Sequence, residues 1–303
     1  MSATSLNSYR LWAYLQLMRP ANIITAWADI LAGFAISGFM VIQAGTLELE
    51  ALGWLLLATT GLYGGGVVFN DVFDAELDNK ERPERPIPSG RASRQSAATL
   101  ASVLLLVGIV AAAQVSFLSA ILAICIAVGA VVYDSLGKHQ ALVGALNMGL
   151  CRGGNLLLGM SAVPAIVGEY WFLALIPIFY IAAITSLSQG EVHGAKGNTP
   201  TIALLLIITV ITALFGLELL PNYHILTALP AIALFTGYLL PPVIQAVSQP
   251  TPEQIRNAVR SGILSLVILD ATIATGFASL PYGLFVLCLL PISIALAQIF
   301  AVT

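Results

Sequence analysis

The sequence predicts an all-α fold, a polytopic transmembrane helical bundle, from two observations. Of its 303 residues, 58% are hydrophobic and only 9% are charged, and the mean hydropathy is +0.93. A soluble protein of this length needs several times more charge to cover its surface. The apolar residues also fall into runs that are long enough to cross a bilayer. These features exclude a soluble enzyme and a nucleic-acid-binding protein, and they name the lipid bilayer as a partner.

Ten runs are long enough to be spans, and the divisions at 115/116 and 280/281 rest on short turns. The runs cover roughly 21–42, 51–70, 95–115, 116–133, 141–163, 170–189, 200–219, 224–246, 259–279 and 282–301. The polar start of the chain leads directly into the first span, so we expect no cleavable signal peptide.

The positive charges predict the orientation of these spans. Lys and Arg precede the first span and otherwise lie in alternate loops, with Arg152 as the exception. They are Arg10, Arg19, Lys80, Arg82, Arg85, Arg91, Arg94, Lys138, Lys196, Arg256 and Arg260. Because cytoplasmic loops carry the excess of Lys and Arg, we expect the N-terminus and all the charged loops to be cytoplasmic. The polar chemistry is then gathered at one membrane face.

The three cysteines do not form a recognisable metal or disulfide pattern. Cys125, Cys151 and Cys288 each lie within an apolar run. We therefore interpret them as small buried hydrophobic residues.

The polar stretch 70–90 reads NDVFDAELDNKERPERPIPSG. Asp71, Asp74 and Asp78 are spaced to share one face of a helix. Crowded carboxylates repel one another unless a cation neutralises them, and oxygen ligands suit Mg²⁺ together with a substrate phosphate. Arg82 and Arg85 follow and suit bidentate binding of the same phosphate group. The alternative is a solvated loop that only orients the chain.

Arg152 is the only Lys or Arg predicted to lie inside a span. A membrane-embedded arginine is costly and is by default a functional candidate that faces the bundle interior. Asn147, Arg152 and Asn155 fit one polar stripe of a helix. The alternative is a structural partner for Asp29 or Asp270, two carboxyls that we interpret as structural.

A second polar loop, residues 186–199, falls after the sixth predicted span, as 70–90 falls after the second. It contains Glu191, His193 and Lys196 on the same predicted side of the membrane. This placement predicts a second half-site. The alternative for His193 is a loop histidine without a special role.

At these residues the chain resembles the UbiA family of membrane prenyltransferases. N-D-x-x-D-x-x-x-D at 70–78, followed by R-P-x-R-P-I-P-S-G at 82–90, is similar to the first signature of that family. Arg19-Pro20-Ala21-Asn22 is similar to its R-P-x-N motif before the first span. Tyr133 and Lys138 resemble its Tyr-and-Lys pair.

The resemblance implies a single transmembrane domain over 1–303, usually of nine helices, around a central cavity. Such proteins transfer an isoprenyl group from its diphosphate to an aromatic or other lipophilic acceptor. Carried over to this sequence, the resemblance assigns Mg²⁺-diphosphate binding to Asn70, Asp71, Asp74 and Asp78. It assigns contacts with the diphosphate oxygens to Arg85 and Lys138, and a cavity position to Asn22.

The second polar loop departs from the family, which generally has a second aspartate cluster there. Its only carboxylate is Glu191, accompanied by Gln189. Either Glu191 and His193 hold a second metal ion, or one metal site remains and Lys196 or Arg152 supplies the missing positive charge. The loop resembles the divergent UbiA-like branch called EboC.

The residues suit the implied reaction. Mg²⁺, Arg and Lys would stabilise the departing diphosphate, and a dry apolar cavity would protect the allylic cation from water. Tyr63, Phe69 and Tyr133 are candidates for cation–π contact. Glu191 and Asp74 are the candidates for a base.

Three functions remain open from the sequence. The first is an active prenyltransferase. The second is a UbiA-like protein that binds or moves a lipophilic or prenylated metabolite without transfer, which the altered second loop favours. The third is a secondary transporter, which predicts inverted repeats with broken helices at the membrane midplane. The sequence makes no prediction of the oligomeric state.

Overall fold

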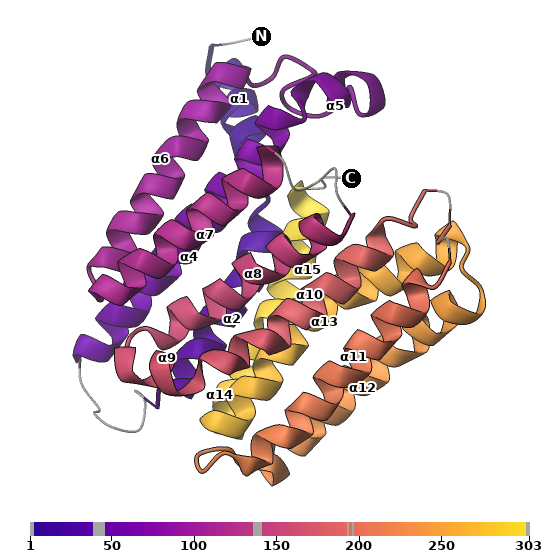
Figure 1. The fold of residues 1–303 in the computed structure, drawn as a ribbon. Helices are drawn as coiled ribbons and strands as arrows, with labels where there is room; N and C mark the ends of the chain where they lie inside the picture. The colour runs from indigo at the N-terminus through magenta and orange to yellow at the C-terminus, as the bar shows by residue number, and fades with distance from the viewer. Residues whose placement is uncertain (1–2, 39–45, 136–140, 193, 196, 301–303) are drawn as a thin grey trace.

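The computed structural model describes residues 3–38, 46–135, 141–192, 194, 195 and 197–300, whose regular elements are all helices (Figure 1). The elements are α1 (Ala3–Met18), α2 (Pro20–Ile36), α4 (Thr46–Phe73), α5 (Ala75–Glu81), α6 (Arg94–Ala113), α7 (Phe117–Ser135), α8 (Ala141–Met160), α9 (Pro164–Tyr170), η2 (Trp171–Ala174), α10 (Leu175–Ser188), α11 (Thr199–Gly216), η3 (Leu217–Leu219), α12 (Ile225–Ser248), α13 (Pro252–Phe277), α14 (Leu280–Leu287) and α15 (Leu289–Phe300). The prediction of an all-α transmembrane bundle is confirmed.

Eight stretches of the described residues are long and apolar enough to cross a bilayer. They are Leu49–Phe73, Arg94–Ala113, Phe117–Ser135, Pro164–Ser188, Thr199–Leu219, Ile225–Ser248, Pro252–Phe277 and Leu280–Phe300. The other two predicted spans coincide with α2 and α8. α2 is shorter, with 17 residues, and α8 contains Asn147, Arg152 and Asn155, which lower its hydropathy.

The two divisions that rested on short turns are present in the structure. α6 ends at Ala113 and α7 begins at Phe117, while α13 ends at Phe277 and α14 begins at Leu280. The Ser279 hydroxyl accepts a hydrogen bond from the backbone N–H of Tyr282 at 3.4 Å, which caps α14. Such a cap satisfies an amide that has no partner within the helix, and so fixes where the helix begins.

α13 is the most buried of the eight stretches. Of the residues in its apolar 18-residue window, 78% are buried, whereas the share for Leu280–Phe300 is 22%. α13 therefore lies inside the bundle, and α14 and α15 lie at its surface. α13 packs against α2, α10, α12 and α14. Because α2 also packs against α4 and α8, these central helices bring distant parts of the chain to one interior.

Glycines allow α2 and α8 to approach closely. A Cβ added to Gly159 would lie 2.5 Å from the carbonyl oxygen of Ile30, and one added to Gly33 would clash with the carbonyl oxygen of Leu156. The absence of a side chain at Gly159 and Gly33 therefore permits the close packing of α8 against α2.

The cysteine prediction is wrong about burial. Cys125 and Cys288 are exposed on the outer surface and Cys151 is half-buried, and all three are free thiols. An apolar run shows that a helix is in the membrane, but it does not show which face of that helix points to the lipid.

Three of the polar connections lie at one end of the bundle, as predicted, whereas the connection that carries Lys138 lies outside the described residues. In Figure 1, α5 lies at the same end as the connection between α10 and α11. The backbone N–H of Ala195 donates a 3.3 Å hydrogen bond to the carbonyl of Pro250, which joins the α10–α11 connection to the α12–α13 connection. The compartment that this end faces stays a prediction.

We expect Gly33→Ala to lower the thermal unfolding temperature of the detergent-solubilised protein, because overpacking of a tight contact costs about 1–3 kcal/mol. Gly53→Ala is the matched control, since a Cβ there meets nothing within 4 Å, and it should be neutral or slightly stabilising. Equal unfolding temperatures for Gly33→Ala and the wild type would show that α2 and α8 are not held this closely.

Candidate functional site

The carboxylates of the 70–90 stretch are carried by two helices. We expected one helical face over 71–78, and this is wrong in detail because α4 ends at Phe73 and α5 begins at Ala75, with Asp74 between them (φ −84, ψ 0). Aspartate favours such a helix boundary over a helix interior. Backbone hydrogen bonds from Asp74 N–H to Asn70 (2.9 Å) and from Asp78 N–H to Asp74 (2.8 Å) keep the turn nearly helical.

Arg19 reaches the same place from the junction of α1 and α2. Its backbone has φ 49 and ψ 67, the only positive φ of a non-glycine residue among those described. Such a conformation costs on the order of 1–3 kcal/mol and persists only where the surroundings enforce it. Pro20 begins α2 directly after it, so the chain turns sharply and the Arg19 side chain points towards α4.

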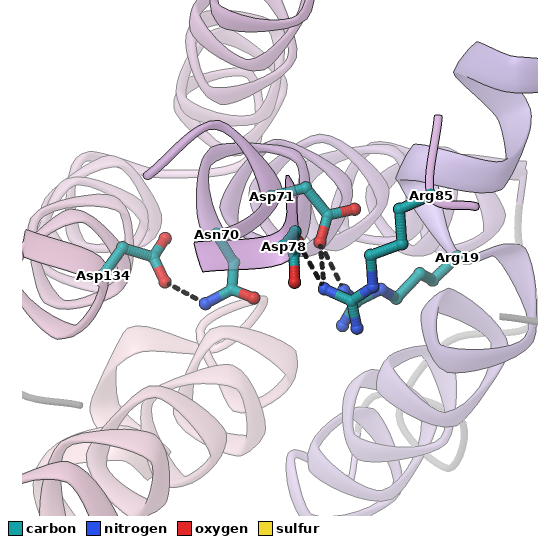
Figure 2. A network of polar contacts seen from close by, with 6 residues as sticks. All are labelled: Arg19, Asn70, Asp71, Asp78, Arg85 and Asp134. Carbon is teal, nitrogen blue, oxygen red and sulfur yellow. Dashed lines mark hydrogen bonds and ion pairs between the residues drawn. The ribbon is translucent and has the colours of Figure 1, made fainter. Parts of the chain in front are cut away.

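Two guanidinium groups hold two carboxylates at this end (Figure 2). Arg19 Nη2 lies 2.6 Å from Asp71 Oδ1. Arg85 Nη1 lies 2.8 Å from Asp78 Oδ2 and 3.4 Å from Asp71 Oδ1. Arg85 therefore bridges Asp71 and Asp78, whose side chains are 4% and 6% exposed.

Asp134 is a further carboxylate that the sequence analysis missed. It is the next-to-last residue of α7, it is buried, and its Oδ1 accepts a 2.9 Å hydrogen bond from the Asn70 amide (Figure 2). It follows Tyr133 just beyond the predicted span 116–133. An acidic residue at that point was the available signal.

A cavity of about 630 Å³ extends from this network into the bundle. Its polar lining comprises Arg19, Asn22, Thr25, Thr59, Tyr63, Asn70, Arg82, Tyr133, Asp134, Arg152, Asn155, Thr185 and Ser188, and its apolar lining includes Leu62, Val67, Ile126, Ala130, Ile181, Ile184, Val259, Ile263 and Leu266. The volume falls within the range of roughly 300–1,000 Å³ that is common for small-molecule sites.

The inner part of the cavity carries Arg152 and Asn155. Arg152 Nη1 lies 3.2 Å from Asp29 Oδ2, and Nη2 donates a 2.8 Å hydrogen bond to Thr25 Oγ1. Asn155 Nδ2 donates to Asp29 Oδ2 at 2.9 Å. Arg152 is therefore the ion-pair partner of Asp29, as the structural interpretation expects, and it also lines the cavity, while its functional role stays a prediction.

Asp270 of α13 completes this inner cluster. Its carboxyl lies within hydrogen-bonding reach of the Asp29 carboxyl. One oxygen of each, Asp29 Oδ1 and Asp270 Oδ2, has no other hydrogen-bond partner among the described residues. Asp270 therefore adds a second acidic group beside the carboxylate that Arg152 already pairs.

Glu191 lies at the rim, near arginines from two other segments. Burial raises the pKa of its carboxyl, and the charges of Arg256 and Arg82 oppose that rise. Glu191 therefore faces cations on α13 and on the 70–90 stretch. His193, Lys196 and Lys138, which the sequence analysis assigned to the site, lie outside the described residues.

The candidate aromatic residues separate. Tyr63 and Tyr133 line the cavity, and the Tyr63 ring centroid lies 5.6 Å from Arg152 Cζ. Phe69 stacks in tilted fashion on Phe73, with centroids 6.1 Å apart, and is not in the cavity lining. Asn147 is also outside it, and accepts a 3.6 Å contact from the Cys151 thiol.

The described residues contain no group of three or more His, Cys, Asp or Glu side chains arranged to hold a metal ion. Asp71 and Asp78 nevertheless converge on one cation, Arg85 Nη1. Mg²⁺ usually takes one or two carboxylates and completes its shell with water and phosphate. The Asp71–Asp78 pair therefore fits Mg²⁺, and in this structure the Arg85 guanidinium occupies the position between them.

Comparison with known proteins gives one family and several relatives. The model of the UbiA prenyltransferase family matches residues 31–259. The chain is 32% identical to a digeranylgeranylglyceryl phosphate synthase of Ignicoccus hospitalis over 62% of this chain and 60% of that protein. The match thus spans less than two thirds of the relative.

The fold is similar to solved structures at low identity. A membrane digeranylgeranylglyceryl phosphate synthase superposes with a TM-score of 0.69 at 22% identity, covering 88% of this chain and 98% of that one. A UbiA homologue from Archaeoglobus fulgidus bound to GPP and Mg²⁺ gives 0.53 at 15% identity, covering 91% and 99%.

We expect Arg152→Met to destabilise the protein by about 3–5 kcal/mol, because it leaves the Asp29 charge buried without its cation. Asp270→Asn should cost less than about 1 kcal/mol, since an amide keeps a hydrogen-bonding group beside Asp29 and leaves the Arg152–Asp29 pair intact. Thermal unfolding of both variants in detergent measures this difference. A loss in Asp270→Asn as large as that in Arg152→Met would mean that the Asp270 charge, and not only that of Asp29, balances the buried arginine.

Proposed function

The chain belongs to the UbiA prenyltransferase family, and from this premise we propose that it transfers an isoprenyl group from an allylic isoprenyl diphosphate to a lipophilic acceptor inside the membrane. One observation carries the proposal. Arg19 and Arg82 line the polar end of a cavity whose inner walls are largely apolar, and Arg19 is paired there with Asp71. A diphosphate with a hydrocarbon tail has this same division of polarity.

The polar end suits the diphosphate. The Nε atoms of Arg19 and Arg85 are buried and have no hydrogen-bond partner among the described residues. Both arginines thus retain donors for phosphate oxygens, and guanidinium groups bind such oxygens in bidentate fashion. Arg82 lines the cavity at the same end, so three arginines surround the proposed position of the leaving group.

We assign the metal-binding role to Asp71 and Asp78, with Asp74 between them and Asn70 beside them. Mg²⁺ held there would neutralise charge on the departing diphosphate. The Archaeoglobus fulgidus homologue that has this fold was solved with GPP and Mg²⁺. If Mg²⁺ took these two carboxylates, the Arg85 guanidinium, which now pairs with them, would be available to bind the diphosphate.

The apolar walls suit the allylic carbon. Cleavage of its bond to the diphosphate oxygen leaves the electron pair on the leaving group and positive charge on the carbon. Leu62, Ile126 and Ile184 exclude water from this region. The rings of Tyr63 and Tyr133 line it and stabilise a cation through their faces.

The surroundings of Glu191 favour a second candidate function, a protein that binds or moves a prenylated or lipophilic metabolite without transfer. Its neighbouring charges are Arg256 and Arg82. Glu191 is also the only carboxylate of residues 186–199, so a second metal ion would find one carboxylate there, whereas Asp71 and Asp78 supply two. The proposed enzyme then works with one metal site, or the chain binds without catalysis.

We expect the purified protein to release diphosphate from geranyl to geranylgeranyl diphosphate only with Mg²⁺ present, with phenolic and quinol acceptors supplied. Asp71→Ala and Asp74→Ala should each lower the rate about 100-fold or more, because the leaving group loses electrostatic stabilisation. Glu76→Ala is the matched control, since its side chain is 88% exposed on the same segment. Mg²⁺-dependent binding of the diphosphate without any release would support the second function.

Glu191→Gln tests the altered loop. Because Glu191 faces Arg256 and Arg82, we expect its loss to slow diphosphate release by less than about tenfold and to leave the Mg²⁺ concentration at half-maximal rate unchanged. Initial rates across a Mg²⁺ titration measure both quantities. A large rise in the Mg²⁺ requirement would instead make Glu191 a metal ligand.

A further inference from the structure

The cavity has an arginine-rich end, which Arg19, Asn70 and Arg82 line, and a second polar region distinct from it. Thr25 lies six positions after Arg19 along α2, and Thr59 lies eleven positions before Asn70 along α4. A helix rises about 1.5 Å per residue, so this region lies roughly 9–16 Å deeper in the bundle. Thr25, Thr59, Tyr63, Arg152 and Asn155 all line the cavity there, and we call these five residues the inner pole.

The inner pole is rigidly held from behind. Thr59 Oγ1 donates to Asn155 Oδ1 at 2.8 Å, and Asn155 Nδ2 donates to the Ala26 carbonyl and to Asp29 Oδ2, both at 2.9 Å. Arg152 is only 6% exposed, and its Nε has no partner among the described residues. A fixed arginine with an unused donor beside a cavity is prepared for a ligand oxygen.

The net charge of the cluster around Arg152 decides which kind of ligand oxygen Arg152 binds. Arg152 is paired with Asp29 at 3.2 Å, so this ion pair is neutral, and Asp270 beside it adds no positive charge. A phosphate added to the cluster would therefore bring a negative charge without a free cation into a buried interior, which is costly. A hydroxyl or carbonyl oxygen adds hydrogen bonds without adding charge.

The prenyl donor does not supply this oxygen. All polar atoms of an isoprenyl diphosphate belong to the diphosphate, which we place at the arginine-rich end, and its chain is hydrocarbon. A second polar region deeper in the same cavity therefore serves the other substrate.

We propose that the inner pole, through Arg152 and with Asn155 holding the cluster in place, binds an uncharged hydroxyl or carbonyl oxygen of the acceptor, so that neutral phenol- or quinol-type lipids are preferred over phosphate-bearing ones. The proposal rests on the proposed function, since it assigns the second substrate of the same cavity.

The test compares two probes with the same tail, 4-dodecylphenol and 4-dodecylphenyl phosphate, on the full chain in lipid nanodiscs, with empty nanodiscs as the blank. We expect the wild type to bind the phenol more tightly. The double variant Asp29→Asn/Arg152→Gln removes both charges of the ion pair together, and it should weaken phenol binding about tenfold or more. Its Mg²⁺-dependent affinity for geranyl diphosphate should change by less than about twofold.

Arg152→Lys is the second variant, because it keeps the ion pair with Asp29 but loses the planar fork, and it should also weaken phenol binding. Asn147→Leu is the matched control on α8, outside the cavity lining, and should bind the phenol as the wild type does. Unchanged phenol affinity in both Arg152 variants overturns the proposal, as does tighter binding of the phosphate probe by the wild type.

The two proposals fail separately. If phenol binding depends on Arg152 but the protein releases no diphosphate, the inner pole is supported as a binding site and the transferase proposal is wrong. If diphosphate is released but substitution of Arg152 does not change the phenol affinity, the transferase proposal is supported and the inner pole is not the acceptor site.

Discussion

The bridge that Arg85 makes between Asp71 and Asp78, with Arg19 on the same Asp71 oxygen, is the interaction on which the polar end of this bundle depends. A charge in a poorly hydrated interior is tolerated only when it is paired. Here the pairing joins the α1–α2 junction, α4, α5 and the proline-rich stretch, four segments with no continuous helix in common. The same contacts that neutralise these charges therefore fix the mouth of the cavity, and the strained backbone of Arg19 is part of that arrangement.

A consequence is that the carboxylates are paired before any ligand arrives. Asp71 and Asp78 face guanidinium groups, and a metal ion must take the place of Arg85 to reach both. This exchange costs little if the displaced cation gains phosphate oxygens, because each charge then keeps a partner. Metal and diphosphate would thus be expected to bind more strongly together than either does alone. The rim at Glu191 follows the same rule, with Arg256 and Arg82 as its cations.

The sequence was sufficient for the membrane-spanning helices, because twenty-residue apolar runs leave the backbone few alternatives in a bilayer, but it did not predict α1, which precedes the first span. It also identified the residues of the 70–90 stretch and Arg152, since charges in such a chain are rare enough to stand out. It could not show that α4 breaks at Asp74, which depends on tertiary contacts with Arg85 and Arg19. Nor did it identify Asp134 or give Arg19 a role, because each matters through a partner more than fifty positions away. The prediction that the cysteines are buried was wrong for a related reason, since hydropathy does not show which face of a helix a residue lies on.

The two polar regions of the cavity differ in one physical respect, their net charge. The outer network carries arginines with spare donors beside the loops, where water and counter-ions compensate any excess, so it accommodates a highly charged diphosphate. The inner cluster lies between α2, α8 and α13, where Asp29 already pairs the arginine. In the proposed reaction, a cavity built this way would separate the two substrates by charge. The diphosphate would bind at the surface end and the neutral oxygen at depth, and the apolar walls between them would surround the reacting carbon.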